Sequence, residues 1–283
     1  MITKRISLTG QPYNGDNALV INGVGVDIGT RVIKWWEPQG FSQYGEDRAE
    51  FKDPKTGKVH IIKGKRYDHR EKGIDGVRQV FIHHSGADRA TPKIMREVLH
   101  NQRGLSVQFA IEDNGVVYQF LDAIEAAQQA GTHNQISIGA ECCLFPSVHD
   151  DPNYYSDANR AKSGNLPHEI RTETLQGMKM KVFCMPEPQA EAICRWAAGL
   201  WFAVCKLGTN RTFAPPRFPR DEHGEIPRKV YDGHLEHVGL IGHLQCTDNK
   251  IDPAGFPWES AEVKVAEYFT SFCASCAETD GEG

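Results

Sequence analysis

Three separated stretches of the sequence contain side chains that could perform hydrolytic chemistry together. The β-rich run VRQVFIHHSG ends in two adjacent histidines, of which His83 is the first. The apolar run ISIGAECCLF is interrupted by Glu141, and the stretch HLQCTDNKIDPAGF holds His243, Lys250 and Asp252. Imidazoles and carboxylates bind divalent cations, and a carboxylate beside an ammonium can move protons and stabilise developing negative charge.

A single zinc site formed where these stretches meet would account for all of these side chains. Catalytic zinc typically takes three protein ligands and keeps a position for water, and His83, His243 and Asp252 match that count. Adjacent strand residues point to opposite faces, so one of the two adjacent histidines can serve a given site and the other packs behind it. In this hypothesis Glu141 accepts a proton from water, and Lys250 stabilises the oxyanion that develops on the attacked carbonyl.

Each of these features also has a structural explanation, and the residues alone leave both readings open. A histidine at a strand end is commonly structural or solvated, and a glutamate within a strand can mark an edge or a bulge. A Lys-x-Asp sequence before proline is common in turns. Because His83 and His243 are distant in sequence, their spacing cannot by itself establish a shared site.

Strands and helices alternate along the chain without a strict βαβ period. The segment TPKIMREVLHNQRG predicts a helix with Thr91 as N-cap and Gly104 as the stop, presenting Met95, Val98 and Leu99 on one face. A long helix is predicted in EPQAEAICRWAAGLWFAVCKLG, ended by Gly208, and another in ESAEVKVAEYFTSFCASC. This pattern favours an α/β fold with a mixed central β-sheet flanked by helices on both faces.

The composition along the chain suggests two regions. Residues 1–75 read as short strands and turns, a β-rich N-terminal extension of unknown role that includes a hairpin around residues 55–57. Residues 76–283 are predicted to form the main domain. Polar, turn-rich insertions near 146–186 and 208–238 interrupt it, and such long segments often lie near a functional site.

Bulk properties exclude several classes of partner. The 283 residues carry a net charge of −5, which gives no basic field for nucleic acid. No apolar run approaches the roughly 20 residues of a membrane-spanning helix, and no secretory signal is evident, so we expect no membrane partner and a cytoplasmic protein as synthesised. The eight cysteines are expected to be reduced thiols, and the single Cys273/Cys276 pair is a weak redox or metal signal. Oligomeric state is not constrained.

The order of four motifs resembles the zinc-dependent N-acetylmuramoyl-L-alanine amidases, the amidase type 2 family, whose fold is shared by peptidoglycan recognition proteins. The motifs are VFIHHSG, VQFAIEDNGVVYQF, AGTHNQISIGAE and GHLQCTDNKIDPAGF, within about residues 77–258. The resemblance implies an amidase-like fold and a Zn²⁺ cofactor. It implies five site residues, with His83, His243 and Asp252 as zinc ligands and with Glu141 as general base and Lys250 as a second catalytic group.

Three positions depart from the family pattern. Val107 stands where some members have a tyrosine, which is consistent with Glu141 as the base. Gln129 replaces a histidine that members often have, and this replacement bears on substrate contacts rather than on the metal. Cys246 follows His243 by three residues and is a possible competing ligand, although its spacing does not match the cysteine of the family.

The resemblance implies hydrolysis of the amide bond between N-acetylmuramic acid and L-alanine in peptidoglycan or muropeptides. Two alternatives remain: a module that binds peptidoglycan without cutting it, and a zinc amidase or peptidase of other specificity. A cytoplasmic origin fits a recycling enzyme, an endolysin released to the cell wall, or an injected effector. The sequence does not distinguish intact wall from soluble muropeptides as the substrate.

Overall fold

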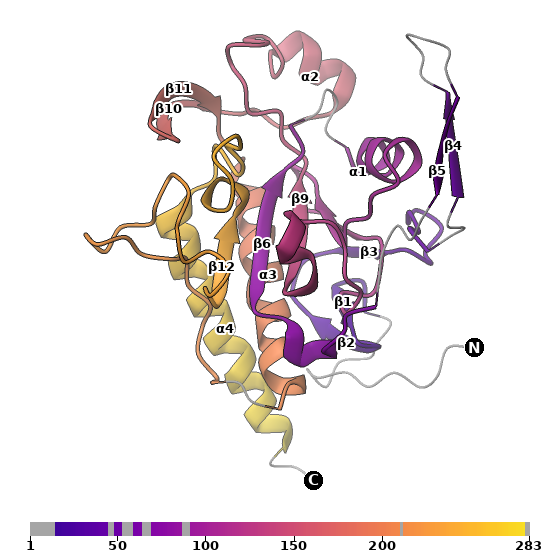
Figure 1. The fold of residues 1–283 in the computed structure, drawn as a ribbon, viewed down its shortest axis with the longest axis vertical. Helices are drawn as coiled ribbons and strands as arrows, with labels where there is room; N and C mark the ends of the chain where they lie inside the picture. Colours follow the sequence, from indigo (N-terminus) through magenta and orange to yellow (C-terminus); the bar gives the residue numbers. More distant parts are fainter. Residues whose placement is uncertain are drawn as a thin grey trace.

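A six-stranded mixed sheet forms the centre of the molecule (Figure 1). The structure, a computed structural model, describes residues 15–44, 48–52, 59–63, 69–86, 91–209 and 212–280. In order across the sheet, its strands are β12 (Gly239–Gly242), β6 (Gln79–His84), β9 (Ser137–Cys142), β7 (Phe109–Ile111), β8 (Val117–Gln119) and β3 (Val32–Lys34). The first four are parallel to one another, whereas β8 runs antiparallel to β7 and β3 runs parallel to β8.

Among the residues that the structure describes, three antiparallel hairpins lie outside the central sheet. They are β1 (Ala18–Ile21) with β2 (Val24–Asp27), β4 (Arg48–Lys52) with β5 (Val59–Lys63), and β10 (Ile170–Leu175) with β11 (Met178–Phe183). The pairing of β4 with β5 confirms the hairpin predicted around residues 55–57, whose turn lies outside the described residues. The third hairpin falls within the insertion predicted at 146–186.

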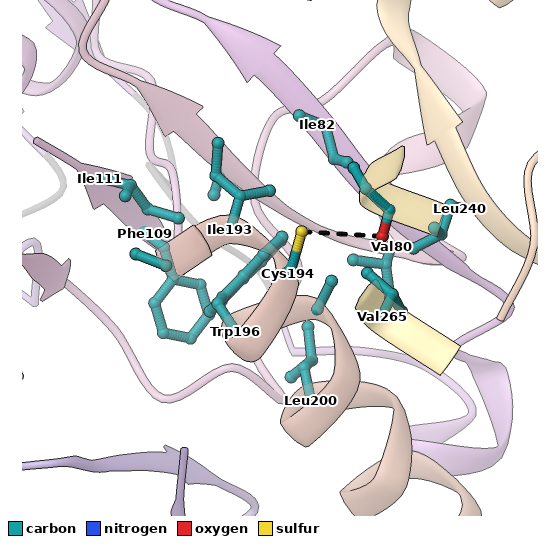
Figure 2. Close-up of a cluster of buried hydrophobic side chains, with 14 of the residues drawn as sticks. Val80, Ile82, Phe109, Ile111, Ile193, Cys194, Trp196, Leu200, Leu240 and Val265 are labelled. Atoms are coloured by element: carbon teal, nitrogen blue, oxygen red, sulfur yellow. Dashed lines mark hydrogen bonds between the residues drawn. The ribbon is translucent and has the colours of Figure 1, made fainter. Parts of the chain in front are cut away.

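Two long helices cover one face of the sheet. Helix α3 (Glu187–Leu207) is buried along most of its length because it lies between the sheet and α4 (Trp258–Asp280). Figure 2 shows this core, where Ile193, Trp196 and Leu200 of α3 meet apolar side chains of β6, β7, β12 and α4. Helix α3 ends immediately before Gly208, as the sequence predicts.

A shorter helix covers the opposite face. Helix α1 (Pro92–Met95) continues directly as the π-helix η2 (Arg96–Gln102), and Thr91 Oγ1 accepts a hydrogen bond from the N–H of Ile94 (3.3 Å), as expected of an N-cap. Met95 and Leu99 pack against apolar residues of β7 and its neighbours in a second core. The predicted mixed sheet with helices on both faces is therefore confirmed.

The remaining elements are short: η1 (Gly73–Gly76), η3 (Gly131–Gln135), α2 (Asp157–Ser163) and η4 (His243–Gln245). Of the insertion predicted at 208–238, the described residues form no helix or strand. Among the helices that the structure describes, none combines the length and the hydropathy needed to cross a membrane.

Strands β1 and β2 share the core that contains α3. Leu19, Ile21 and Val26 of β1 and β2 are fully buried in the core that contains α3, and β3 adds an edge strand to the sheet. The division into an N-terminal extension of residues 1–75 and a main domain of residues 76–283 stays a prediction.

Candidate active site

The two predicted histidine ligands meet because the strands that precede them are neighbours. His83 lies near the carboxyl end of β6, and His243 follows directly after β12, which runs parallel to β6. Asp252 Oδ2 lies 2.9 Å from His83 Nδ1 and 3.2 Å from His243 Nδ1. Two ligands each about 2.0–2.1 Å from a tetrahedral zinc ion would be separated by about 3.3 Å. The three side chains are therefore spaced for one ion.

A chain of buried amides determines which nitrogen of His83 carries the proton. Gln108 Oε1 accepts from the N–H of Gly139 (3.2 Å), while Gln108 Nε2 donates to the carbonyl of Glu125 (2.9 Å). Gln129 Nε2 donates to Gln108 Oε1 (2.7 Å), so Gln129 presents its oxygen to His83 Nε2 at 2.9 Å. His83 Nε2 must then be the protonated nitrogen in the neutral ring.

This tautomer leaves an unsatisfied pair of acceptors that a cation would satisfy. The lone pair of His83 Nδ1 faces the carboxylate oxygen of Asp252 across 2.9 Å. Burial lowers the pKa of His83, which disfavours filling the gap with a proton, although Asp252 opposes that shift. Burial alone would raise the pKa of Asp252, but its contacts with His243 and His83 outweigh it and hold that pKa well below its usual range. Two imidazoles and one carboxylate are a donor set that suits zinc.

Glu141 lies beside the ligand group. The parallel pairing of β6 with β9 sets Glu141 directly opposite His83 in register, on the same face of the sheet. Burial raises the pKa of Glu141 to about 8; Asp252 adds to the shift, while Lys250 and Arg103 oppose it. A carboxyl group with a pKa near neutrality is suited to exchanging protons at working pH.

One cavity of about 170 Å³ brings all five predicted site residues together. His83, Glu141, His243, Lys250 and Asp252 all contribute to its lining, with a wall that includes Arg103 at the end of η2. His84 also lines the cavity, but it is not part of the ligand group, and its ring nitrogens have no hydrogen-bond partner among the described residues. The roles of the five residues stay predictions.

Two positions that depart from the family pattern have environments that the sequence did not reveal. Gln129 is buried, and its side-chain oxygen lies 2.9 Å from His83 Nε2 at the lining of the cavity. Cys246 is not part of the ligand group of His83; it lies with His133 and His234. Gln129 directly precedes the motif AGTHNQISIGAE and Cys246 lies within GHLQCTDNKIDPAGF, but contacts between distant segments leave no periodic signal in the sequence.

Removal of the Gln129 amide is expected to weaken zinc binding. Gln129→Ala would release His83 from its fixed tautomer, and loss of such an outer partner typically costs about 10–100-fold in metal affinity. Zinc affinity can be measured by competition with a chromophoric chelator. Gln128→Ala is the matched control, because Gln128 accepts hydrogen bonds from Ser106 and does not touch His83. Equal affinity of the Gln129→Ala variant and the wild type would contradict this role.

The tip of the β10–β11 hairpin supports the loop that carries Lys250 and Asp252. Gln176, in the left-handed region at φ 51°, and Gly177 form the turn. Gln176 Nε2 lies 2.7 Å from the carbonyl oxygen of Leu244, 2.9 Å from that of Thr247 and 3.0 Å from that of Lys250. One amide thus connects the insertion at 146–186 to three points on the active-site loop.

Gln176→Ala is expected to destabilise the protein by about 1–2 kcal/mol, since its amide makes contacts that are each worth roughly 1 kcal/mol net. Alanine keeps the same left-handed backbone requirement, so the change isolates the side chain. Chemical denaturation measures the free energy of unfolding, and Met178→Ala, at an exposed position of the same hairpin, is the control. If both variants unfold alike, the amide does not hold the loop.

The fold and the cavity fit one class of protein, a hydrolase whose candidate base and candidate metal ligands lie at or just after the carboxyl ends of parallel strands. Residues 73–175 match the family described as N-acetylmuramoyl-L-alanine amidase, a range that includes His83 and Glu141. The match confirms, for this part of the chain, the resemblance predicted from the order of the motifs.

Solved structures with a similar chain course include two clostridial enzymes. The endolysin N-acetylmuramoyl-L-alanine amidase LysCS from Clostridium intestinale is 11% identical, with a TM-score of 0.41 over 83% of this chain and 95% of that chain. The amidase LysC from the same organism is 13% identical, with a TM-score of 0.38 over 68% and 87%. A selenomethionine AmpD derivative is 13% identical, with a TM-score of 0.34 over 82% and 98%. No curated protein sequence matches the chain.

Proposed function

We propose that the protein is a zinc-dependent enzyme that hydrolyses the amide bond between N-acetylmuramic acid and L-alanine in peptidoglycan or muropeptides. The observation that carries this proposal is the convergence of His83, His243 and Asp252 beside Glu141 in one cavity, within and next to the matched amidase domain. His83, His243 and Asp252 would hold the ion. When bound, zinc supplies a Lewis acid that polarises a carbonyl and acidifies water.

The side chains of the cavity divide the remaining work. Glu141 accepts a proton from the attacking water and later gives it to the nitrogen of the departing L-alanine, so the amine leaves neutral. The ammonium group of Lys250 lines the same cavity and stabilises negative charge on the carbonyl oxygen. Gln129 keeps the ring of His83 in one tautomer and orientation through the whole cycle.

The identity of the substrate can be tested by offering the same amide bond in two forms, intact cell wall and a soluble muropeptide. Purified protein is given either intact cell wall or a soluble muropeptide, and the new amino terminus of L-alanine is quantified. Cleavage of the wall supports a lysin or an injected effector, and preference for the soluble fragment supports a recycling enzyme in the cytoplasm. The assay is repeated after removal of metal by a chelator and after addition of zinc.

The expected result is turnover that disappears with chelation and returns with zinc. Binding of wall fragments without any product would replace the proposal with a non-catalytic module. Products cut at another amide would replace it with a zinc peptidase of different specificity.

A further inference from the structure

A second group of metal-binding side chains lies near the candidate active site. His133 comes from η3, His234 from the loop before β12, and Cys246 caps the carboxyl end of η4. One potential ligand atom from each lies within 4.8 Å of the other two, and His133 and Cys246 are buried. The ring of Phe81 contacts both places, 4.3 Å from the ring of His83 and 5.5 Å from that of His133. The group shares no residue with the candidate ligands around Asp252.

Gln79 prepares one nitrogen of this group for a cation. The Gln79 side chain is fully buried, and its Nε2 donates to the carbonyls of His234 (2.5 Å) and His237 (3.0 Å). Its Oε1 must therefore accept, and it lies 2.6 Å from His133 Nδ1. The proton of a neutral His133 is thereby fixed on Nδ1, and Nε2 turns its lone pair toward the group. Metal-bound histidines are commonly held by such an acceptor on the other nitrogen.

The remaining two members complete a donor set. His234 Nδ1 lies 2.9 Å from His133 Nε2 and can donate to it when no ion is bound. If the proton of His234 moves to its Nε2, both facing nitrogens become ligands. The thiol of Cys246 becomes the third ligand by releasing one proton to solvent, so binding one divalent ion forms three bonds to the protein and frees one proton.

We propose that His133, His234 and Cys246 form a second zinc site with a structural role. Two imidazoles and a thiolate are a borderline-soft set that suits zinc better than magnesium or calcium. The ion would connect three segments that are separate in sequence, including the described part of 208–238, which has no helix or strand. This inference does not rest on the proposed hydrolysis.

Two measurements test the second site: the zinc content of the protein and the absorption spectrum of the cobalt-substituted protein. The full chain is loaded with zinc, dialysed and analysed for bound metal; a second sample is loaded with Co²⁺ and its near-ultraviolet absorption is recorded. A thiolate bound to Co²⁺ gives a charge-transfer band, and the site around Asp252 contains no thiolate. Comparison of the wild-type spectrum with that of Cys246→Ser then assigns the band to the second site.

Wild-type protein is expected to bind two equivalents of zinc and to show the band. Cys246→Ser and His234→Gln should each lose one equivalent and the band, so that failure of one variant to fold leaves the other as a test. Cys194→Ser is the matched control, because Cys194, like Cys246, is a buried thiol 3.6 Å from a backbone carbonyl oxygen. It should keep both equivalents and the band.

Asp252→Asn separates this proposal from the proposed function, because it should lose the other equivalent and retain the band. Absence of the band in wild-type protein, or its persistence in Cys246→Ser, would overturn the second site. Cys246 would then be a small apolar side chain packed against Phe81 and Ile241.

Discussion

Replacing Glu141 by glutamine is expected to lower turnover by about 10²- to 10⁴-fold, the usual contribution of a positioned general base. Glutamine preserves the shape of the side chain in the cavity but cannot accept the proton of water. Zinc content should stay at the wild-type level, because Glu141 is not among the candidate ligands. Steady-state kinetics on a muropeptide, with metal analysis of the same samples, measures both quantities.

The pH profile gives a second signature of Glu141. Because the carboxylate is the active form, the rate should rise with pH through the pKa of Glu141, which burial raises to about 8 in the absence of an ion. A bound cation favours the carboxylate, so the acid limb of the loaded enzyme should lie below that value. The glutamine variant should lack this limb.

Glu112→Gln is the matched control for Glu141→Gln. Burial raises the pKa of Glu112 as well, but this side chain does not line the active-site cavity. Wild-type turnover is expected for it. An unchanged rate in the Glu141 variant, or an acid limb that survives the substitution, would remove Glu141 from the mechanism.

Asp252→Asn is expected to reduce zinc affinity by more than the roughly 10–100-fold that follows loss of an outer-shell partner. Asp252 Oδ2 contacts both His83 and His243, and it is the anionic member of the group. Asparagine keeps the size of the side chain but removes the negative charge that compensates the cation. Competition with a chromophoric chelator gives the affinity, and turnover at limiting zinc should fall in parallel.

Asp248→Asn provides the comparison, because Asp248 is an exposed carboxylate on the same loop. It should bind zinc like the wild type. If the two asparagine variants lose affinity equally, the effect comes from the net charge of the loop and not from coordination by Asp252.

Local sequence patterns predict much of the fold, and the helix after Thr91 shows where such patterns no longer predict which residues are buried. The dense apolar spacing before Gly208 predicts α3 and its end correctly, because a helix buried on most sides repeats its signal at every turn. In the helix after Thr91, the spacing predicts that Val98 shares the apolar face with Leu99. The chain there forms a π-helix, whose wider turn changes the facing residues, so that Leu99 and His100 are buried and Val98 is half-buried.

The sequence predicts which side chains meet at the cavity better than it predicts the residues that support them. His83 and Glu141 could be found because each interrupts or ends an apolar strand, and strand ends gather at one edge of a parallel sheet. The partners of the second histidine group could not be found in this way. His133 and His234 are 101 positions apart, and their meeting depends on how η3 and an irregular loop pack against β6. No periodicity encodes a contact of that kind.

The hydrogen bonds from Gln176 to the loop between Leu244 and Lys250 limit how chimeras between related enzymes can be built. The family match ends at residue 175, just before the turn that contains Gln176. A chimera joined at that point would therefore take Gln176 and the loop it supports from a different parent than the matched region. The hairpin and the loop that follows β12 would have to be transplanted as one piece, because either inherited alone would leave backbone carbonyls without the amide that holds them.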